Sequence, residues 1–261
     1  MSRNERINRI LEMVGKSGAL DVEECANALK VSEATIRRDF EELAKRQLVI
    51  RIHGGIQAIG AAYGLPLRYK TAREDQGKIR IAKAAAKMVT RGSVIGLNGG
   101  TTTTELAREL GISPQLQDDS GERTLTIVTN AVNIASELVI RSNIKIVVTG
   151  GVARPHSYEL IGDYARPVID GLVIDTAFLG VNGFDPIIGA TANHEGEARI
   201  GQLIAEASKR IVIVSTADKV GHQAFARFCK PEQVDTLLTD RELDTEIAAQ
   251  LADRGVNVVV C

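Results

Sequence analysis

The sequence has few of the features that secreted, metal-binding or membrane proteins need. Its 261 residues include only three cysteines, at positions 25, 229 and 261. No two of them form a CxxC pair and no histidine stands at metal-ligand spacing, so neither a disulfide framework nor a metal site is predicted. No apolar run approaches the roughly 20 residues that cross a bilayer, and residues 2–9 are too polar for a signal peptide. We therefore expect a cytoplasmic protein without a cofactor or a membrane partner.

A strong charge of one sign is also missing. The formal net charge is −1, and 44% hydrophobic with 25% charged residues describes an ordinary globular chain. Such a chain is long enough for one or two domains, each with a sizeable core.

Three helical patterns and a short strand pattern are present near the N-terminus. Apolar residues recur at helical spacing over 7–14 and 22–29, and Ser32 is a good N-cap for a third helix with its own apolar stripe. Alternation over 48–53 then predicts a short basic hairpin. Helix, helix-turn-helix and wing in this order predict a DNA-binding domain at 1–56, whose third helix enters the major groove.

The polar face of the third helix and the wing offer the candidate DNA contacts. For this helix alone, a surface helix with solvated charges is the better explanation. The two preceding helices and the wing reverse that preference, because hydroxyl and guanidinium groups then face phosphates or guanine edges. The candidates are Ser32, Glu33, Thr35, Arg37, Arg38, Lys45, Arg51 and His53.

The local charge of this segment is modest. Residues 36–53 hold five basic and three acidic side chains, a net of +2 that the whole-chain sum hides. Because phosphate contacts supply much of the affinity for DNA, we expect useful binding to need a dimer or tetramer that reads repeated half-sites. A homo-oligomer bound to operator DNA is therefore predicted.

A different pattern begins after residues 57–75, which contain glycines and a proline without sustained periodicity and are predicted to be a linker. From 76 to 261, buried strands alternate with helices. This predicts a Rossmann-like parallel α/β sheet covered on both faces, with ligands at the carboxyl ends of the strands. The expected strands are 93–97, 125–129, 144–149, 176–180, 211–215, 236–238 and 256–260.

Small, amide and hydroxylated residues follow several of these strands and predict an anion pocket. The sharpest segment is 98–103, whose glycines let backbone N–H groups approach a phosphate at a helix start. A tight turn with threonine caps and no ligand fits this segment equally well. It is neither a Walker loop nor a dinucleotide fingerprint, because the Gly-Lys-Ser/Thr and G-x-G-x-x-G patterns are missing. The candidates are Asn98, Gly99, Gly100, Thr101, Thr102, Thr103, Thr129, Asn130, Gly150 and Gly151.

Two segments, Val31-Ser32-Glu33-Ala34-Thr35-Ile36-Arg37-Arg38-Asp39-Phe40 and Arg51-Ile52-His53-Gly54-Gly55, resemble the signature of DeoR-family bacterial transcriptional regulators. Segments 98–103, 148–151, 157–162, 175–183 and 197–198 resemble landmarks of that family's sugar-phosphate sensor domain in the same order. The chain departs from the family pattern at Cys25, where Leu is usual, at Asn98, where many members have Asp, and at Thr216, which replaces an Asp.

The resemblance implies a repressor of a carbohydrate-utilisation operon, with a phosphorylated sugar or amino sugar as effector. It adds Arg154, Asn182 and Lys219 to the candidate effector residues. Lys219 fits a solvated loop lysine as well as a cation that reaches the phosphate. Segments 128–135 and 194–199 resemble the branch of the family that regulates N-acetylgalactosamine use. The identity of the sugar and the direction of control stay open.

A sugar-phosphate isomerase-like enzyme is the alternative, because the family's sensor domain resembles ribose-5-phosphate isomerases. The Asp-Gly-Ala-Asp-Glu pattern of those enzymes falls on 179–183, where Leu179 and Asn182 stand in place of two carboxylates. Since that chemistry needs a carboxylate base, no catalytic residue is predicted. An oxidoreductase is not predicted, because the chain lacks the dinucleotide fingerprint. An architectural DNA-binding protein would not account for the second domain.

Overall fold

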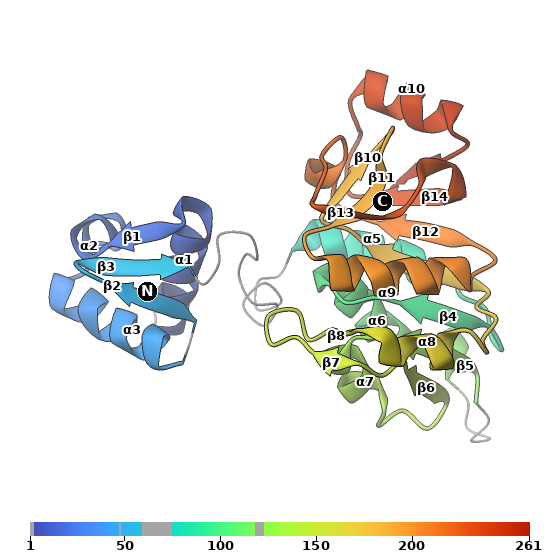
Figure 1. The fold of residues 1–261 in the computed structure, drawn as a ribbon, viewed down its shortest axis with the longest axis horizontal. Coiled ribbons are helices and arrows are strands. Elements are labelled where there is room, and N and C mark those ends of the chain that lie inside the picture. Colours follow the sequence, from blue (N-terminus) through green and yellow to red (C-terminus); the bar gives the residue numbers. More distant parts are fainter. Residues whose placement is uncertain (1–2, 47, 59–74, 118–122) are drawn as a thin grey trace. The chain divides into compact units, whose positions relative to one another are not determined.

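The chain folds into two units, Met1–Arg73 and Glu74–Cys261 (Figure 1). The computed structural model describes residues 3–46, 48–58, 75–117 and 123–261. The range expected to be a linker, 57–75, overlaps this described part only at its ends. Residues 57 and 58 continue a strand and Asp75 caps a helix, whereas 59–74 lie outside the described residues.

Three helices of the first unit bury one common core, as the helical spacing predicts. Ile10, Ile36 and Phe40 have no exposed area. Ser32 is the N-cap of the third helix, and its hydroxyl accepts a hydrogen bond from the Thr35 N–H at 3.3 Å. The helices are α1 (Arg3–Ser17), α2 (Val22–Leu29) and α3 (Glu33–Lys45), and α2 with α3 forms the helix-turn-helix.

Cys25, a departure from the family pattern, lies in this core with no exposed area. Burial raises the pKa of its thiol to about 11. The thiol therefore stays neutral near pH 7 and packs as a small apolar group in a position that suits leucine.

The wing is a three-stranded antiparallel sheet in the order β1-β3-β2. The first strand is not predicted by the sequence, because three residues are too few to show alternation. Its last residue, Asp21, is also the N-cap of α2 and accepts a hydrogen bond from the Glu23 N–H at 2.7 Å. A Cβ on Gly55 would come within 2.3 Å of the Leu20 carbonyl oxygen, so only glycine fits this close strand pair. The strands are β1 (Ala19–Asp21), β2 (Val49–Ile52) and β3 (Gly55–Ala58).

One buried ion pair ties α3 to α1. The Asp39 carboxylate is only 2% exposed and accepts from Arg6 Nε at 2.6 Å and from Arg6 Nη2 at 3.3 Å. The hydrogen bond to Asp39 raises the pKa of Arg6. Arg3 lies at 3.8 Å from the same carboxylate. The pair orients α3, which is predicted to be the DNA-recognition helix, against α1, because each charge is stabilised by the other once it is removed from water.

The second unit is built on a seven-stranded sheet in the order β15-β14-β12-β9-β4-β5-β6. Every neighbouring pair in it is parallel, so the predicted α/β class is confirmed. Its strands agree with the seven expected ones to within one residue at each end. They are β4 (Val94–Leu97), β5 (Leu125–Thr129), β6 (Ile144–Val148), β9 (Thr176–Gly180), β12 (Ile211–Val214), β14 (Thr236–Thr239) and β15 (Asn257–Val260).

Successive side chains of the central strands enter two separate cores. Phe178 belongs to the core on one face, whereas Ala177 and Leu179 belong to the core on the other, and all three are fully buried. Continuous apolar strands are typical of parallel sheets that are covered twice. One core contains side chains of α5 (Gln76–Lys87), α6 (Thr101–Ile112) and α7 (Val132–Leu138), the other those of α8 (Arg166–Ile169), α9 (Glu195–Glu206) and α10 (Thr245–Asp253).

The described residues of the second unit form five further strands outside the large sheet. They are not predicted by the sequence, because they lack the apolar runs that identify the strands of the large sheet. Two form a hairpin beside the ends of the parallel strands, and three form a small antiparallel sheet. They are β7 (Val152–Ala153), β8 (Leu160–Ile161), β10 (Gly183–Asp185), β11 (Gly189–Ala192) and β13 (Ala226–Cys229).

The order of the large sheet reverses between β4 and β9. From β4 the chain proceeds to β5 and β6 on one side, whereas β9, β12, β14 and β15 follow on the other. Connections therefore leave the carboxyl ends of β4 and β9 in opposite directions. In open α/β sheets, the crevice outside such a reversal point is where ligands bind. Within the described residues, no helix is long and apolar enough to cross a membrane.

Replacing Asp39 with alanine is expected to destabilise the first unit by about 1.5–3 kcal/mol, because the partly buried Arg6 loses its charged hydrogen-bond partner. Amide hydrogen exchange of the full chain checks this, with faster exchange expected in α1 and α3 and unchanged exchange in the second unit. The matched control is Glu41→Ala, which removes an exposed carboxylate from the same helix. Equal exchange in the two variants would contradict the role of the ion pair.

Candidate functional site

The candidate DNA-binding residues at the start of α3 contact one another. The Ser32 and Thr35 hydroxyls lie 2.9 Å apart. Arg37 donates to Glu33 at 2.9 Å in an exposed pair one helical turn apart. Such surface pairs contribute little to stability, so DNA phosphates compete with Glu33 for the guanidinium at small cost.

Arg38, Lys45 and His53 are exposed, and the structure gives none of the three an ion pair with another described residue. Arg38 lies on the outer face of α3, opposite the buried Ile36 and Phe40, as the helical wheel predicts. His53 lies in the turn between β2 and β3, next to Gly54 with φ +74°. These side chains are ready for contact with a polyanion.

Arg51 is held by the wing itself. Its guanidinium lies 5.7 Å from the centre of the Phe40 ring and donates to the Gly55 carbonyl oxygen. A guanidinium stacked on an aromatic ring is oriented but keeps donors for a phosphate. Arg51 thus joins the wing to the recognition helix as well as adding positive charge.

In the second unit, Asn98 bridges the two strands at the point of sheet reversal. Its Nδ2 donates to the Gly180 carbonyl oxygen at 2.9 Å, and its Oδ1 accepts from the Gly180 N–H at 2.8 Å. Both halves of the amide are therefore used between the ends of β4 and β9, and the residue is 9% exposed. An aspartate would offer an oxygen in place of the Nδ2 donor, which explains why an amide suits this geometry.

The turn that follows β4 leads into α6 without a side-chain cap. Gly100 is the N-cap residue, at φ +146°, and no side chain accepts from the first-turn N–H groups. The Thr103 and Thr104 hydroxyls donate backwards to the Gly100 carbonyl oxygen, at 3.2 and 2.6 Å. The N–H groups at the positive end of the helix dipole are consequently left for an anion. Thr101 is half-buried, and Thr102 and Thr103 are buried.

The turns after β5 and β6 have structural contacts of their own. Thr129 Oγ1 accepts from the Ala131 N–H at 3.0 Å. Asn130, fully buried, donates to the Leu160 carbonyl oxygen at 3.1 Å. A Cβ on Gly151 would come within 2.6 Å of the Ile161 carbonyl oxygen, so this glycine, with Gly150, starts the β7–β8 hairpin that approaches these turns.

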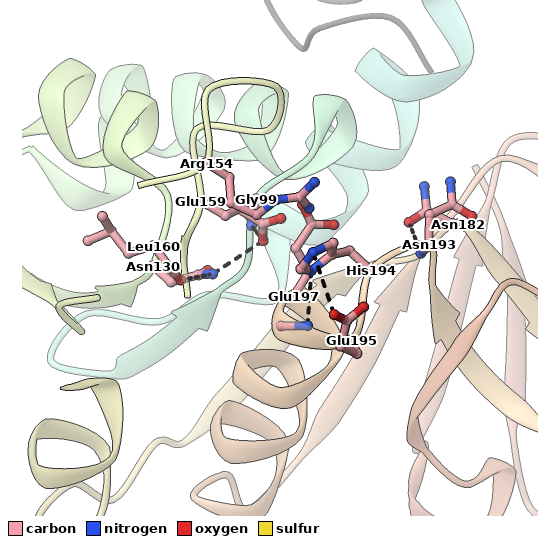
Figure 2. Close-up of polar contacts among 11 residues, drawn as sticks. Gly99, Asn130, Arg154, Glu159, Leu160, Asn182, Asn193, His194, Glu195 and Glu197 are labelled. Atoms are coloured by element: carbon pink, nitrogen blue, oxygen red, sulfur yellow. Dashed lines mark hydrogen bonds and ion pairs between the residues drawn. The ribbon is translucent and has the colours of Figure 1, made fainter. Parts of the chain in front are cut away.

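The hairpin places a carboxyl group on the turn after β4 (Figure 2). Glu159 Oε1 accepts from the Gly99 N–H at 2.8 Å and from Asn130 Nδ2 at 3.3 Å. The residue is 4% exposed. A Cβ on Gly99 would come within 2.3 Å of Glu159 Cγ, so glycine is required for this approach. Tyr158, with φ +59°, bends the hairpin immediately before it.

A second carboxylate and one arginine complete the cluster. Glu197, at the start of α9, pairs with Arg154 of the hairpin at 2.5 Å, and both side chains are about 15% exposed. Burial raises the pKa of Glu159 to about 8, and the nearby Glu197 carboxylate adds to this shift. His194 caps α9 by accepting from the Gly196 N–H at 3.0 Å. We call Gly99, Asn130, Arg154, Glu159 and Glu197 the acid cluster.

Asn182 follows β9, and Lys219, in the turn after β12, reaches the same place with its ammonium group. Asn182 is exposed and its Oδ1 accepts from the Asn193 N–H at 3.0 Å. Lys219 is half-buried and donates to the Val181 carbonyl oxygen at 2.8 Å. The lysine is therefore anchored to the backbone near the crevice and is not simply a solvated loop residue.

Glu159 and Glu197 are the site residues that sequence reasoning missed. Both fall in segments that resemble family landmarks, 157–162 and 197–198, but neither was expected to meet the turn after β4. One signal was available, since Glu159 is an acidic residue between Tyr158 and Leu160 in a short segment that follows two glycines. A charged residue in such a setting is either exposed or held by a specific partner.

The arrangement suits anion binding better than metal binding or catalysis. No three His, Cys, Asp or Glu side chains in the described parts of the chain come together as a metal site. An uncapped helix start, backbone N–H groups and Arg154 attract an anion, whereas Glu159 and Glu197 suit hydroxyl groups as acceptors. A small molecule with a phosphate and hydroxyl groups combines both requirements.

Comparison with known proteins matches both units of the chain. Residues 6–61 match the family model described as a DeoR-like helix-turn-helix domain, and residues 73–241 match the DeoR C terminal sensor domain. The chain is 34% identical over 257 residues to the HTH-type transcriptional regulator GlpR of Haloferax volcanii, covering 98% of this chain and 96% of that protein. It is 28% identical over 261 residues to the glycerol-3-phosphate regulon repressor of Escherichia coli, covering 100% of both.

The matches also include the putative aga operon transcriptional repressor of Escherichia coli O157:H7, 26% identical over 260 residues and covering 98% of this chain and 93% of that protein. Among solved structures, ribose 5-phosphate isomerase A from Methanocaldococcus jannaschii matches with a TM-score of 0.39 and 21% identity. That match covers 55% of this chain and 53% of the isomerase, so it is a distant likeness only.

Replacing Arg38 with alanine is expected to weaken binding to specific DNA by about 1–3 kcal/mol for each half-site, because an exposed guanidinium of the recognition helix is lost. Fluorescence anisotropy with a labelled duplex checks this. The control is Arg108→Ala, which removes an exposed arginine from α6 in the second unit. An equal loss in both variants would mean that α3 does not make the contact.

Replacing Glu159 with glutamine is expected to stabilise the protein at pH 8 but not at pH 4.5. The pKa of Glu159 is raised to about 8 in the folded chain. The wild-type carboxyl group therefore contributes its full stability only below its unfolded pKa, and this stability is lost as the pH rises through the folded pKa. Differential scanning calorimetry should show a melting temperature about 5 °C higher for the variant at pH 8, the shift that roughly 1–2 kcal/mol produces in a domain of this size. A constant difference across pH 4.5–8 would contradict the raised pKa.

Proposed function

This chain belongs to the DeoR family of transcriptional regulators, and we propose that it represses a carbohydrate-utilisation operon under the control of a phosphorylated sugar. The observation that carries the proposal is the uncapped start of α6 at the reversal point of the sheet, in a chain that also has a winged helix-turn-helix. The regulators and repressors named above match this chain over nearly their whole length. The chain is accordingly a regulator and not an isomerase.

The phosphate of the effector would lie at the first turn of α6. Backbone N–H groups of Thr101 and Thr102 are at the positive end of the helix dipole, where a dianion is favoured. Arg154 adds a positive charge at the edge of the acid cluster. Asn98 would position this turn through Gly180 without contacting the effector.

The sugar would extend towards the acceptors of the crevice. Glu197, with Asn182 and the anchored Lys219 at the end of β9, supports recognition of hydroxyl groups. The names of two relatives refer to a glycerol-3-phosphate regulon and to the aga operon, which favours a small phosphorylated polyol or an amino-sugar phosphate. An acetamido sugar would agree with the resemblance of segments 128–135 and 194–199 to the amino-sugar branch.

Operator DNA would bind across α3 and the wing. The exposed Arg38 and Lys45 and the oriented Arg51 would contact phosphates and base edges. Because residues 36–53 carry a net charge of only +2, a dimer or tetramer would be needed to bind repeated half-sites tightly.

Control would operate through linkage between the two sites. If the effector binds more tightly to the form of the protein that does not hold the operator, each ~1.4 kcal/mol of differential affinity lowers operator affinity tenfold. We expect release of DNA, as befits a repressor that responds to the nutrient its operon consumes.

The direct test is operator binding with and without phosphorylated sugars. A duplex selected from random DNA by the protein would be titrated in the presence of glycerol 3-phosphate, ribose 5-phosphate, glucose 6-phosphate or N-acetylgalactosamine 6-phosphate. We expect one of them to weaken DNA binding at least tenfold and to raise the melting temperature of the protein. No change with any of the four, at millimolar concentration, would refute effector control by a sugar phosphate.

The variant Thr102→Val is expected to lose the response to the sugar phosphate while DNA affinity stays within twofold of the wild type. The hydroxyl beside the phosphate is removed and the shape of the side chain is kept. Thr245→Val, at the exposed first position of α10, is the matched control and should respond normally. Dose-response curves of operator release compare the variants, and an unchanged response of Thr102→Val would remove this residue from the site.

A further inference from the structure

The turn proposed to hold a phosphate already carries a carboxyl group. Glu159 Oε1 accepts the Gly99 N–H at 2.8 Å, one residue before the N-cap of α6. The contact is close along the whole side chain, because a Cβ on Gly99 would come within 2.3 Å of Glu159 Cγ and 2.6 Å of its Cδ. A dianion at the start of α6 would therefore lie beside this carboxyl group. Two like charges at such a distance in a buried site repel each other strongly.

The surroundings of Glu159 supply one positive charge, and that charge has another partner. Arg154, from the same hairpin, pairs with Glu197 of α9 at 2.5 Å. His194 caps the same helix. The turns after β4 and β5 contribute only the uncharged Gly99 N–H and the Asn130 amide. Glu159 is thus the carboxyl group of the acid cluster without an ion pair among the described residues, and it is 4% exposed.

The acid cluster also has more acceptors than donors. The Asn130 side chain is fully buried, and its Oδ1 has no hydrogen-bond partner among the described residues. Together with the two carboxyl groups, this oxygen leaves a place for one further hydrogen. A proton on Glu159 would reduce the charge of the cluster and add one hydrogen-bond donor to it.

We propose that Glu159 makes effector binding proton-linked: the phosphate occupies the turn after β4 only when the carboxyl group of Glu159 is protonated. The inference rests on the proposed function, because it concerns the same phosphate site. No covalent step is involved. When the protein with an ionised Glu159 binds the phosphate dianion, Glu159 takes up one proton from solvent. The protonation state of Glu159 therefore determines whether the site binds a phosphate dianion.

The raised pKa of Glu159, about 8, indicates where the linkage acts. At pH 7 the carboxyl group is already mostly protonated, so binding is little affected. Above pH 8 each bound phosphate must bring a proton with it, and the dissociation constant rises with pH. Between pH 7.0 and pH 9.5 the expected loss of affinity is about thirtyfold. The phosphate itself is a dianion throughout this range, because its second pKa is near 6.

Isothermal titration calorimetry of the full chain tests this inference. The four sugar phosphates named above, none of which carries a titratable amine, are titrated at pH 7.0 and pH 9.5, and the tightest binder is followed further. At pH 8.5, buffers of different ionisation enthalpy count the protons exchanged. We expect uptake of about three-quarters of a proton at pH 8.5, and about a thirtyfold weaker affinity at pH 9.5 than at pH 7.0.

The variant Glu159→Gln should bind the same sugar phosphate with one affinity at both pH values and without proton uptake. Glu206→Gln is the matched control, because it removes an exposed carboxylate from the other end of α9, and it should keep the wild-type pH dependence. Calorimetric melting establishes that both variants are folded.

The outcomes separate this inference from the proposed function. If none of the four compounds binds the wild-type chain at pH 7.0, both are overturned. If one binds with equal affinity at both pH values, or if Glu159→Gln keeps the wild-type pH dependence, only the proton linkage is overturned. A folded Glu159→Gln that no longer binds at pH 7.0 also overturns it, because Glu159 would then be needed as an anion or a proton donor.

Discussion

The reversal of strand order between β4 and β9 is the constraint on which the second unit depends. The reversal lies at the place where open α/β sheets bind ligands, and the two hydrogen bonds between Asn98 and Gly180 join the carboxyl ends of these strands there. The chain after Asn98 then passes through two glycines directly into the uncapped start of α6. Without that fixed turn, neither a phosphate nor the Glu159 carboxyl group would find a defined set of N–H donors.

The acid cluster gives this crevice a character that the sheet alone does not provide. An anion-binding helix start normally attracts negative charge, yet here two carboxyl groups lie beside it, and of these only Glu197 is paired with Arg154. Burial disfavours the ionised form of Glu159, so the cluster holds a proton that would otherwise be in solvent. The two carboxyl groups come from the β7–β8 hairpin and from the start of α9. Positions 179 and 182, in and just after β9, hold leucine and asparagine.

The sequence predicted the elements that have a strong local pattern and missed those that do not. Strand β9 and helix α3 were recognised because runs such as 176–180 and a capped stripe from Ser32 are strong local signals. The three-residue strand β1 and the hairpin β7–β8 have no such signal, since their pairing depends on contacts distant in the chain. For the same reason the turn at 98–103 was predicted to be a phosphate site, but the contact of Gly99 with Glu159, sixty residues later, was not predicted. Local patterns identify helix starts and turns, while partners across the fold require the tertiary structure.

In the proposed function, sugar-phosphate binding at the second unit is coupled to DNA binding at the first. Thermodynamic linkage requires this coupling to be reciprocal. The most direct measurement is the affinity of the effective sugar phosphate for the free protein and for its complex with operator DNA, by calorimetry at one pH and salt concentration. We predict that the protein–DNA complex binds the sugar phosphate more weakly than the free protein does, by the same factor by which the sugar phosphate weakens DNA binding. Equal affinities for the free and DNA-bound protein would contradict it.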